Sequence, residues 1–210
     1  MKGTGVRITR LVAFAIVFAA GPAFGQVCAP QTATTPASGD RAAVIADLTD
    51  TATKFIELAN SMPAETFTWR PSEHDRSVSE LYLCVAGLYF HQPSEFGAVR
   101  AGSYELDGNA ASAGLEKKIP PFEKRTTDKK EVVDWLIDAR AYFKGIMPTL
   151  SDDDWKKTIK LNGRDITANE GLFEMAAELH GCMSQALTYA RAKGVSPPWP
   201  ETASERDSAH

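Results

Sequence analysis

Glu178 and Cys182 are the residues whose types and spacing most clearly suggest chemistry in this sequence of 210 residues. They are four residues apart in a segment with helical periodicity, so they lie about 40° apart on one flank of that helix. A carboxylate and a thiolate on one flank are typical ligands of a metal ion such as zinc. His180 lies between them in the sequence but about 160° from Cys182, so it is badly placed to share an ion with that cysteine.

Cys84 lies on a second predicted helix, on the same stripe as Leu81, Leu88 and His91. His91 is two turns from Cys84, about 10.5 Å along the axis, which is too far for a common metal ion unless the helix ends there. A cation at the end of this helix would also suit the helix dipole. His91 and His180 are therefore lesser candidates for a metal site.

Segments near both ends of the predicted domain carry a family resemblance. They read Phe67-Thr68-Trp69-Arg70-Pro71, Arg76-Ser77-Val78-Ser79-Glu80-Leu81 and His180-Gly181-Cys182-Met183-Ser184-Gln185, with Tyr189-Ala190-Arg191, Gly194 and Pro197-Pro198-Trp199 beyond. In order and spacing they resemble the DinB-like (YfiT-like) metalloenzyme family over roughly residues 41–199. The resemblance implies an all-α four-helix bundle in which one histidine of the second helix and two of the fourth hold a divalent metal. The matching positions here are Cys84, Glu178 and Cys182.

This substitution leaves three interpretations open. Cys84, Glu178 and Cys182 could bind zinc, with water as a fourth ligand. Alternatively, Cys84 and Cys182 could form a disulfide, because positions that share an ion lie close together and an exported protein meets oxidants. They could also be small apolar fillers left after the metal was lost. We favour no cofactor over a metal such as zinc, because two thiolates are hard to keep in an oxidising compartment.

Residues 1–25 have the pattern of a signal peptide. A basic stretch precedes the apolar run at 11–20, and Ala23 and Gly25 supply the small residues of a cleavage site before Gln26. Ten apolar residues are too few to span a bilayer, which takes about 20. We therefore predict a periplasmic or secreted protein, cleaved near Gly25-Gln26, that keeps no stable membrane anchor.

The remaining sequence predicts one helical domain over residues 41–199, between a flexible lead-in at 26–40 and a disordered tail at 200–210. Apolar residues recur at three- and four-residue steps, which predicts long helices near 41–61, 77–91, 128–147 and 168–193. Glycines and prolines in 92–126 predict a long connection between the second and third helices, with a short helix at 94–100.

Local signals refine these boundaries. Ser77 and Glu80 predict a capping box at the second helix, and Thr126 or Thr127 is the expected cap of the third. A one-turn helix is expected around 151–155, and Asn162-Gly163 predicts a hairpin within 157–166. The fourth helix should begin near Thr167 or Asn169 and end at Gly194.

Charge and motifs exclude several classes of function. The chain has 23 Lys and Arg against 27 Asp and Glu, a formal net charge of −4, which argues against a nucleic-acid partner. No Gly-rich phosphate loop, Ser-His-Asp order or Cys-x-x-Cys pair occurs in the sequence. A small-molecule ligand and a second copy of the chain remain the expected partners.

The resemblance implies two classes of function for an exported DinB-like protein with an altered metal site. One is a metal-dependent enzyme of the thiol-transferase or hydrolase type, in which the ion lowers the pKa of a bound thiol or water. The other is a non-catalytic module that binds a small ligand in the bundle's cleft, roofed by the 92–126 connection. The sequence names no substrate.

Overall fold

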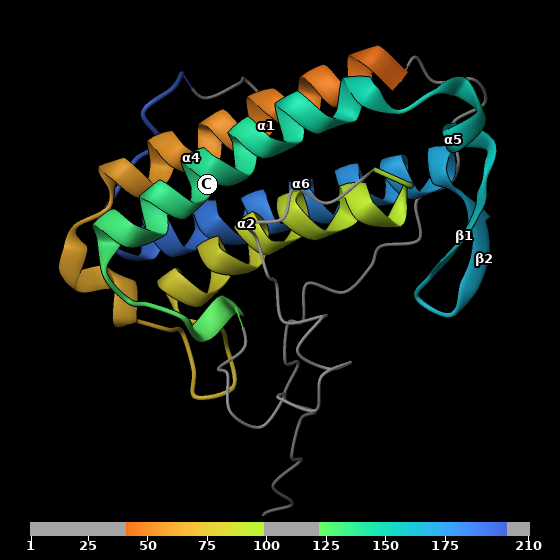
Figure 1. Ribbon diagram of the computed structural model, residues 1–210. Helices are drawn as coiled ribbons and strands as arrows, with labels where there is room; N and C mark the ends of the chain where they lie inside the picture. The colour runs from red at the N-terminus through yellow and green to blue at the C-terminus, as the bar shows by residue number, and fades with distance from the viewer. Residues whose placement is uncertain (1–40, 99–121, 201–210) are drawn as a thin grey trace, which may run out of the picture.

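Four long helices form the framework of the protein: α1 (Arg41–Ser61), α2 (Val78–Glu95), α4 (Lys129–Ile146) and α6 (Ala168–Ala192). The computed structural model describes residues 41–98 and 122–200. The four helices lie side by side as a bundle (Figure 1). The all-α prediction and the four predicted long helices are confirmed, although α2 ends later than predicted. The predicted signal peptide and lead-in, most of the predicted long connection and nearly all of the predicted tail lie outside the described residues.

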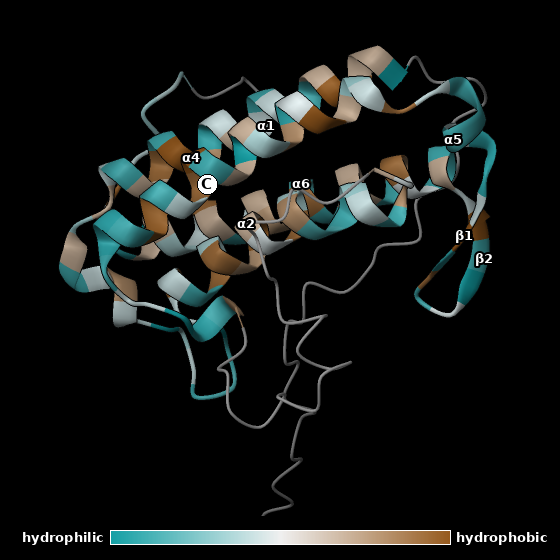
Figure 2. Ribbon diagram, in the orientation of Figure 1, coloured by the Kyte–Doolittle hydropathy of each residue, from teal (hydrophilic) through white to brown (hydrophobic). Residues whose placement is uncertain are grey.

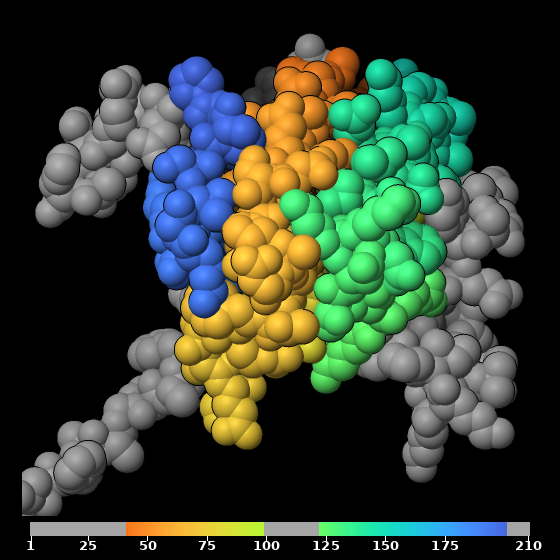
Figure 3. Space-filling view, turned by 90° about the vertical axis from the view of Figure 1, so that its left-hand side faces the viewer, coloured from red at the N-terminus to blue at the C-terminus, as the bar shows by residue number. Residues whose placement is uncertain are grey.

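The helices are arranged so that α1 and α2 each pack against both α4 and α6. Figure 3 shows α1 lying between α6 and α4 on one face of the molecule. Each long helix carries apolar and polar residues around its circumference (Figure 2), which is typical of helices that bury one side. Apolar side chains from all four helices join in one core, whose largest fully buried members include Phe55, Tyr82, Tyr89 and Phe143.

The start of α2 follows the predicted capping box. The Glu80 backbone N–H donates to Ser77 Oγ at 3.2 Å, and the Ser77 N–H donates to Glu80 Oε2 at 2.8 Å. The end of α2 differs from the prediction, because the helix continues past His91 through Pro93 to Glu95. A proline in the last turn removes only one backbone donor, and the Ala98 N–H then donates to the Pro93 carbonyl at 2.9 Å. Residues 94–95 therefore belong to α2 and not to a separate short helix.

The cap of α4 is Asp128, so the expectation of Thr126 or Thr127 was wrong. The Asp128 carboxylate accepts from the Glu131 N–H at 3.0 Å. Thr126 Oγ1 instead accepts from the Asp128 N–H at 3.1 Å, which orders the turn before the helix. An ionised cap of this kind also interacts favourably with the helix dipole.

Short elements connect α4 to α6. They are η3 (Met147–Thr149), α5 (Asp152–Lys156), and an antiparallel hairpin of β1 (Thr158–Leu161) and β2 (Arg164–Thr167) at one end of the bundle (Figure 1). Asn162 and Gly163 have φ angles of 51° and 77°, as a type I′ turn requires. The one-turn helix and the hairpin are therefore confirmed.

Both ends of α6 are fixed by local hydrogen bonds. Thr167 and Glu170 form a capping box at its start. At its end Gly194 has φ 71°, and the Val195 N–H donates to the Ala190 carbonyl at 2.9 Å. This pattern is a Schellman motif, in which a left-handed residue closes the helix. The predicted boundaries of this helix are therefore confirmed.

Segments from both ends of the region that carries the family resemblance meet in space. The rings of Trp69, before α2, and Tyr189, near the end of α6, pack edge to face with centroids 5.5 Å apart. The Tyr189 hydroxyl donates to the Arg76 carbonyl at 3.1 Å, and Lys193 Nζ lies 3.9 Å from the centre of the Trp69 ring. These contacts position the first turn of α2 against the last turns of α6.

Candidate functional site

The candidate residues lie where α2 packs against α6. On α2, Glu80, Cys84, Leu88, His91 and Glu95 are half-buried, and their spacing places them on one stripe of the helix. The residues to either side of this stripe are buried in the core. Cys84 therefore lies at the margin of the bundle and not fully inside it, where a site shared with Cys182 was expected.

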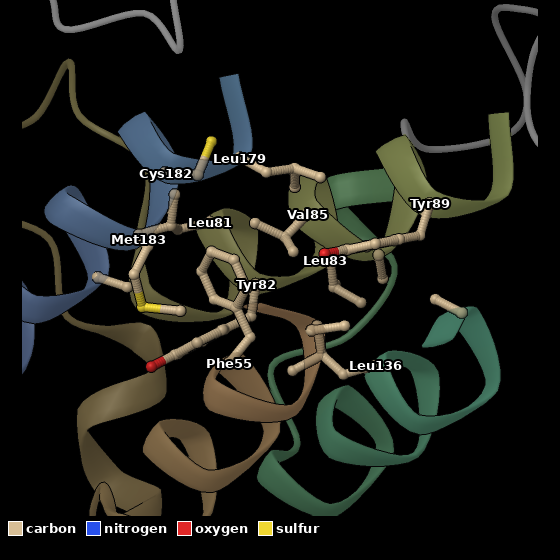
Figure 4. Packing of buried hydrophobic residues seen from close by; sticks show 14 of the residues in the cluster. Phe55, Leu81, Tyr82, Leu83, Val85, Tyr89, Leu136, Leu179, Cys182 and Met183 are labelled. Carbon is tan, nitrogen blue, oxygen red and sulfur yellow. The ribbon is translucent and has the colours of Figure 1, made fainter. Parts of the chain in front are cut away.

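Cys182 is only 1% exposed and belongs to the apolar core. Figure 4 shows it on α6 beside Leu179, with Leu81 and Met183 nearby. No disulfide joins Cys84 to Cys182, so the disulfide interpretation is not supported. The different burial of the two residues gives a reason, since Cys182 is packed among apolar side chains while Cys84 lies on the half-buried stripe.

The predicted ligands do not form a metal-binding group. Within residues 41–98 and 122–200, no three His, Cys, Asp or Glu side chains are grouped so that they could hold an ion. Burial raises the pKa of Glu178, and Glu174 adds to this rise while Arg76 opposes it. A metal ligand must lose its proton, and burial makes that loss more costly for Glu178. The residues present therefore do not fit the divalent ion that the resemblance implies.

The two histidine candidates lie apart from Cys182. His180 points toward α1, where its Nε2 lies 2.7 Å from Asp47 Oδ2 on the protein surface. This confirms that His180 faces away from the α2 side of α6. His91 Nε2 lies 3.3 Å from Glu95 Oε1, one turn further along α2.

A pocket opens one to two turns along α2 from Cys84, between α2, α6 and the tip of the hairpin. Its volume is about 290 Å³. Three apolar side chains and five polar side chains line it: Leu88, Leu161, Met175, His91, Gln92, Asn162, Glu174 and Glu178. Glu178 is the only residue of the predicted ligand set that reaches this pocket, and His91 is the only other candidate.

Two oxygen atoms of this lining are buried without a hydrogen-bond partner. They are Gln92 Oε1 and Glu174 Oε2. Gln92 is 8% exposed, and the other oxygen of Glu174 accepts from Arg164 of β2. Buried polar atoms in native proteins are nearly always paired, so two acceptors without a protein donor in one lining are unusual.

Sequence reasoning did not identify Gln92, Glu174 or the hairpin residues of the pocket. One signal was present, because Glu174 and Glu178 are four residues apart and therefore share a flank of α6. Gln92 carried no such signal. Leu161 and Asn162 reach the pocket only because the hairpin folds back beside α2.

Comparisons with known proteins support the fold. No protein-family model matches the sequence, and no curated protein matches it. Among solved structures the chain is similar to YfiT from Bacillus subtilis, described as "a probable metal-dependent hydrolase with an unusual four-helix bundle topology". The two are 15% identical, the match covers 79% of this chain and 94% of YfiT, and the TM-score is 0.57. The DinB/YfiT-like fold is therefore confirmed.

Proposed function

We propose that this protein is an exported DinB-like bundle that binds a small molecule between α2, α6 and the hairpin, without a resident metal ion. The pocket carries this proposal, since its lining combines apolar walls with several convergent polar groups. Small-molecule sites have this composition, and their volumes are typically about 300–1,000 Å³. A pocket of about 290 Å³ is at the lower end of that range, so the ligand is small.

The altered metal positions support binding over metal-dependent catalysis. Cys182 is packed within the apolar core, and an ion drawn to it would have to leave water for a site with few polar neighbours. Burial raises the pKa of Glu178, because it withdraws the carboxylate from water. The cavity lies beside these residues and needs no ion to form.

A metal-dependent hydrolase is the second candidate, and the likeness to YfiT favours it. This function would require Cys84, Glu178 and Cys182 to close around an ion. Metal content therefore separates the two proposals.

We expect protein purified from the producing cells to contain well below one equivalent of zinc, manganese, iron or nickel. A chelator should leave the melting temperature unchanged, since no bound ion stabilises the folded state. A reductant should also leave it unchanged, because Cys84 and Cys182 are not joined. Elemental analysis and thermal melts test these expectations. About one equivalent of metal together with a chelator-sensitive melt would establish the hydrolase candidate instead.

A fragment screen by ligand-observed NMR tests the pocket itself. Leu88 is half-buried in the lining, so Leu88→Trp should fill the cavity and abolish the binding of fragments that the wild type retains. Ile137→Trp is the matched control, since Ile137 is exposed on α4. Fragments that bind wild type and Leu88→Trp equally would show that the pocket is not a binding site.

Export rests on the pattern of residues 1–25. None of the helices in the described part of the chain has the length and apolar character needed to cross a bilayer. If the signal is cleaved as proposed, protein from a periplasmic fraction begins at Gln26. Mass spectrometry of the N-terminal peptide measures this, and an intact Met1 in a cytoplasmic fraction would exclude export.

A further inference from the structure

We infer that the pocket between α2, α6 and the hairpin takes a small organic ammonium ion, whose N–H groups bond the oxygens of Gln92, Glu174 and Glu178. This inference rests on the proposed function and names the class of ligand. Three features of the lining carry it: two unpartnered acceptors, the excess of carboxylates, and an apolar wall.

The unpartnered acceptors require a hydrogen-bond donor. Gln92 Oε1 and Glu174 Oε2 are both buried and both lack a partner. An amide can turn to present its NH₂ group, but a carboxylate oxygen is an acceptor in every orientation. A buried acceptor that stays unpaired costs about 1–3 kcal/mol. An ammonium group has three donors and no acceptor, so it complements such a pair.

The charges around the pocket favour a cation. Glu174 and Glu178 both line it, one turn apart on α6. Arg164 pairs with one oxygen of Glu174, and Arg76 acts on Glu178 from the start of α2. His91 Nε2 lies 3.3 Å from Glu95 Oε1, one turn further along α2. A water molecule could donate to the two acceptors, but only a cation would also offset the carboxylates.

The apolar part of the lining selects an organic cation over a bare ion. Leu88, Leu161 and Met175 offer no ligand atoms suited to a hard metal ion, and they can contact a short hydrocarbon body. A phosphate or carboxylate ligand would place its negative charge beside two glutamates, which is unfavourable. The two unpartnered oxygens could not donate a hydrogen bond to such a ligand. An aliphatic or aromatic amine of a few carbon atoms matches the lining.

Benzylammonium is a suitable probe, with benzyl alcohol and benzoate as its neutral and anionic counterparts. The three have similar size and differ in charge. Calorimetric titration of the mature protein should show binding of benzylammonium and affinities at least about tenfold lower for the other two, because a hydrogen bond to a charged group is worth about 1.5–3 kcal/mol.

Two variants locate the binding. Glu178→Gln keeps the shape of the side chain and removes its charge, and Gln92→Leu removes the amide oxygen that has no partner. Each variant should weaken the binding of benzylammonium about tenfold, because each removes or weakens a hydrogen bond to the charged ammonium group. Gln92→Leu should leave the melting temperature unchanged or raise it, since it removes a buried acceptor without a partner. A purely structural role of Gln92 would lower the melting temperature. Asp138→Asn is the control, because Asp138 is an exposed carboxylate on α4 and does not line the pocket.

The outcomes separate the ligand class from the proposed function. Equal or tighter binding of benzyl alcohol or benzoate, abolished by Leu88→Trp, would overturn the ammonium inference and leave the pocket as a binding site. The three variants Glu178→Gln, Gln92→Leu and Asp138→Asn could instead change the affinity for benzylammonium by the same factor. That result would overturn the ammonium inference, because the ligand would then respond to the charge of the protein surface and not to the pocket. A lack of any benzylammonium binding would also overturn it. The proposed function is contradicted by other results: about one equivalent of bound metal with a chelator-sensitive melt, or fragments that bind wild type and Leu88→Trp equally.

Discussion

Replacing Leu136 by alanine is expected to lower the free energy of unfolding by about 2–5 kcal/mol. Leu136 is 3% exposed on α4 and belongs to the core, and Figure 4 shows it in the same cluster as Leu83 and Phe55. Truncation removes buried methyl groups and leaves a cavity that the neighbouring helices fill only in part. The loss is a large fraction of the 5–15 kcal/mol that stabilises a typical domain.

The next residue provides a matched control. Ile137 is 44% exposed on the same helix, so Ile137→Ala removes a side chain of the same composition that buries much less area than Leu136. Its effect should stay within about 0.5 kcal/mol, as for most surface substitutions. Urea denaturation measures both variants, and the melting temperature should fall by about 2–4 °C per kcal/mol in a domain of this size. Similar losses at both positions would mean that α4 does not face the core as described.

Most of the fold could be predicted because its signals are local. The capping box of Ser77 and Glu80 lies within one turn of helix, and Gly194 ends α6 through hydrogen bonds to residues close in sequence. Asn162-Gly163 forms the turn of the hairpin for the same reason. The errors were at boundaries, where two local signals competed. The prolines and glycines of 92–126 predict an end of α2 near residue 91, but a proline in the last turn costs a helix only one donor.

The candidate site was harder to predict because it depends on contacts between distant segments. The angle of about 40° between Glu178 and Cys182 was correct for a helix. That angle is nevertheless enough to place Glu178 on a half-buried flank and Cys182 in the core. The pocket could not be found from α2 and α6 alone, because the tip of the hairpin supplies one of its walls. Helical spacing predicts the direction in which a side chain points, but not how deeply neighbouring elements bury it.

Placing histidines at three positions of α2 and α6 should create a metal site. The resemblance places the family's histidines at Cys84, Glu178 and Cys182, and the likeness to YfiT confirms the fold that would position them. An imidazole reaches further from the backbone than a thiol. Three positions that converge through histidines therefore need not converge through cysteines, which is a physical reason why no three-ligand group forms here.

We expect the variant with Cys84→His, Glu178→His and Cys182→His to bind about one equivalent of zinc. Without metal it should be less stable than the wild type by about 1–3 kcal/mol, because Cys182 is 1% exposed and a larger side chain overpacks the core. Zinc at 1,000 times its dissociation constant adds about 4.1 kcal/mol, which exceeds that loss. Thermal melts with and without zinc should therefore show a large stabilisation of the variant and none of the wild type.

The control keeps two of the histidines and replaces the third by alanine, as Cys84→His, Glu178→His and Cys182→Ala. Two imidazoles leave a zinc ion short of the three protein ligands that even an open site uses, so its stabilisation by zinc should be far smaller. Equal stabilisation of both variants would show that Cys182 does not correspond to a ligand position. The absence of any zinc effect would show that α2 and α6 hold these positions too far apart. In either case the alignment of this chain with the family's metal site would be wrong, while the bundle and its pocket would stand on the contacts described above.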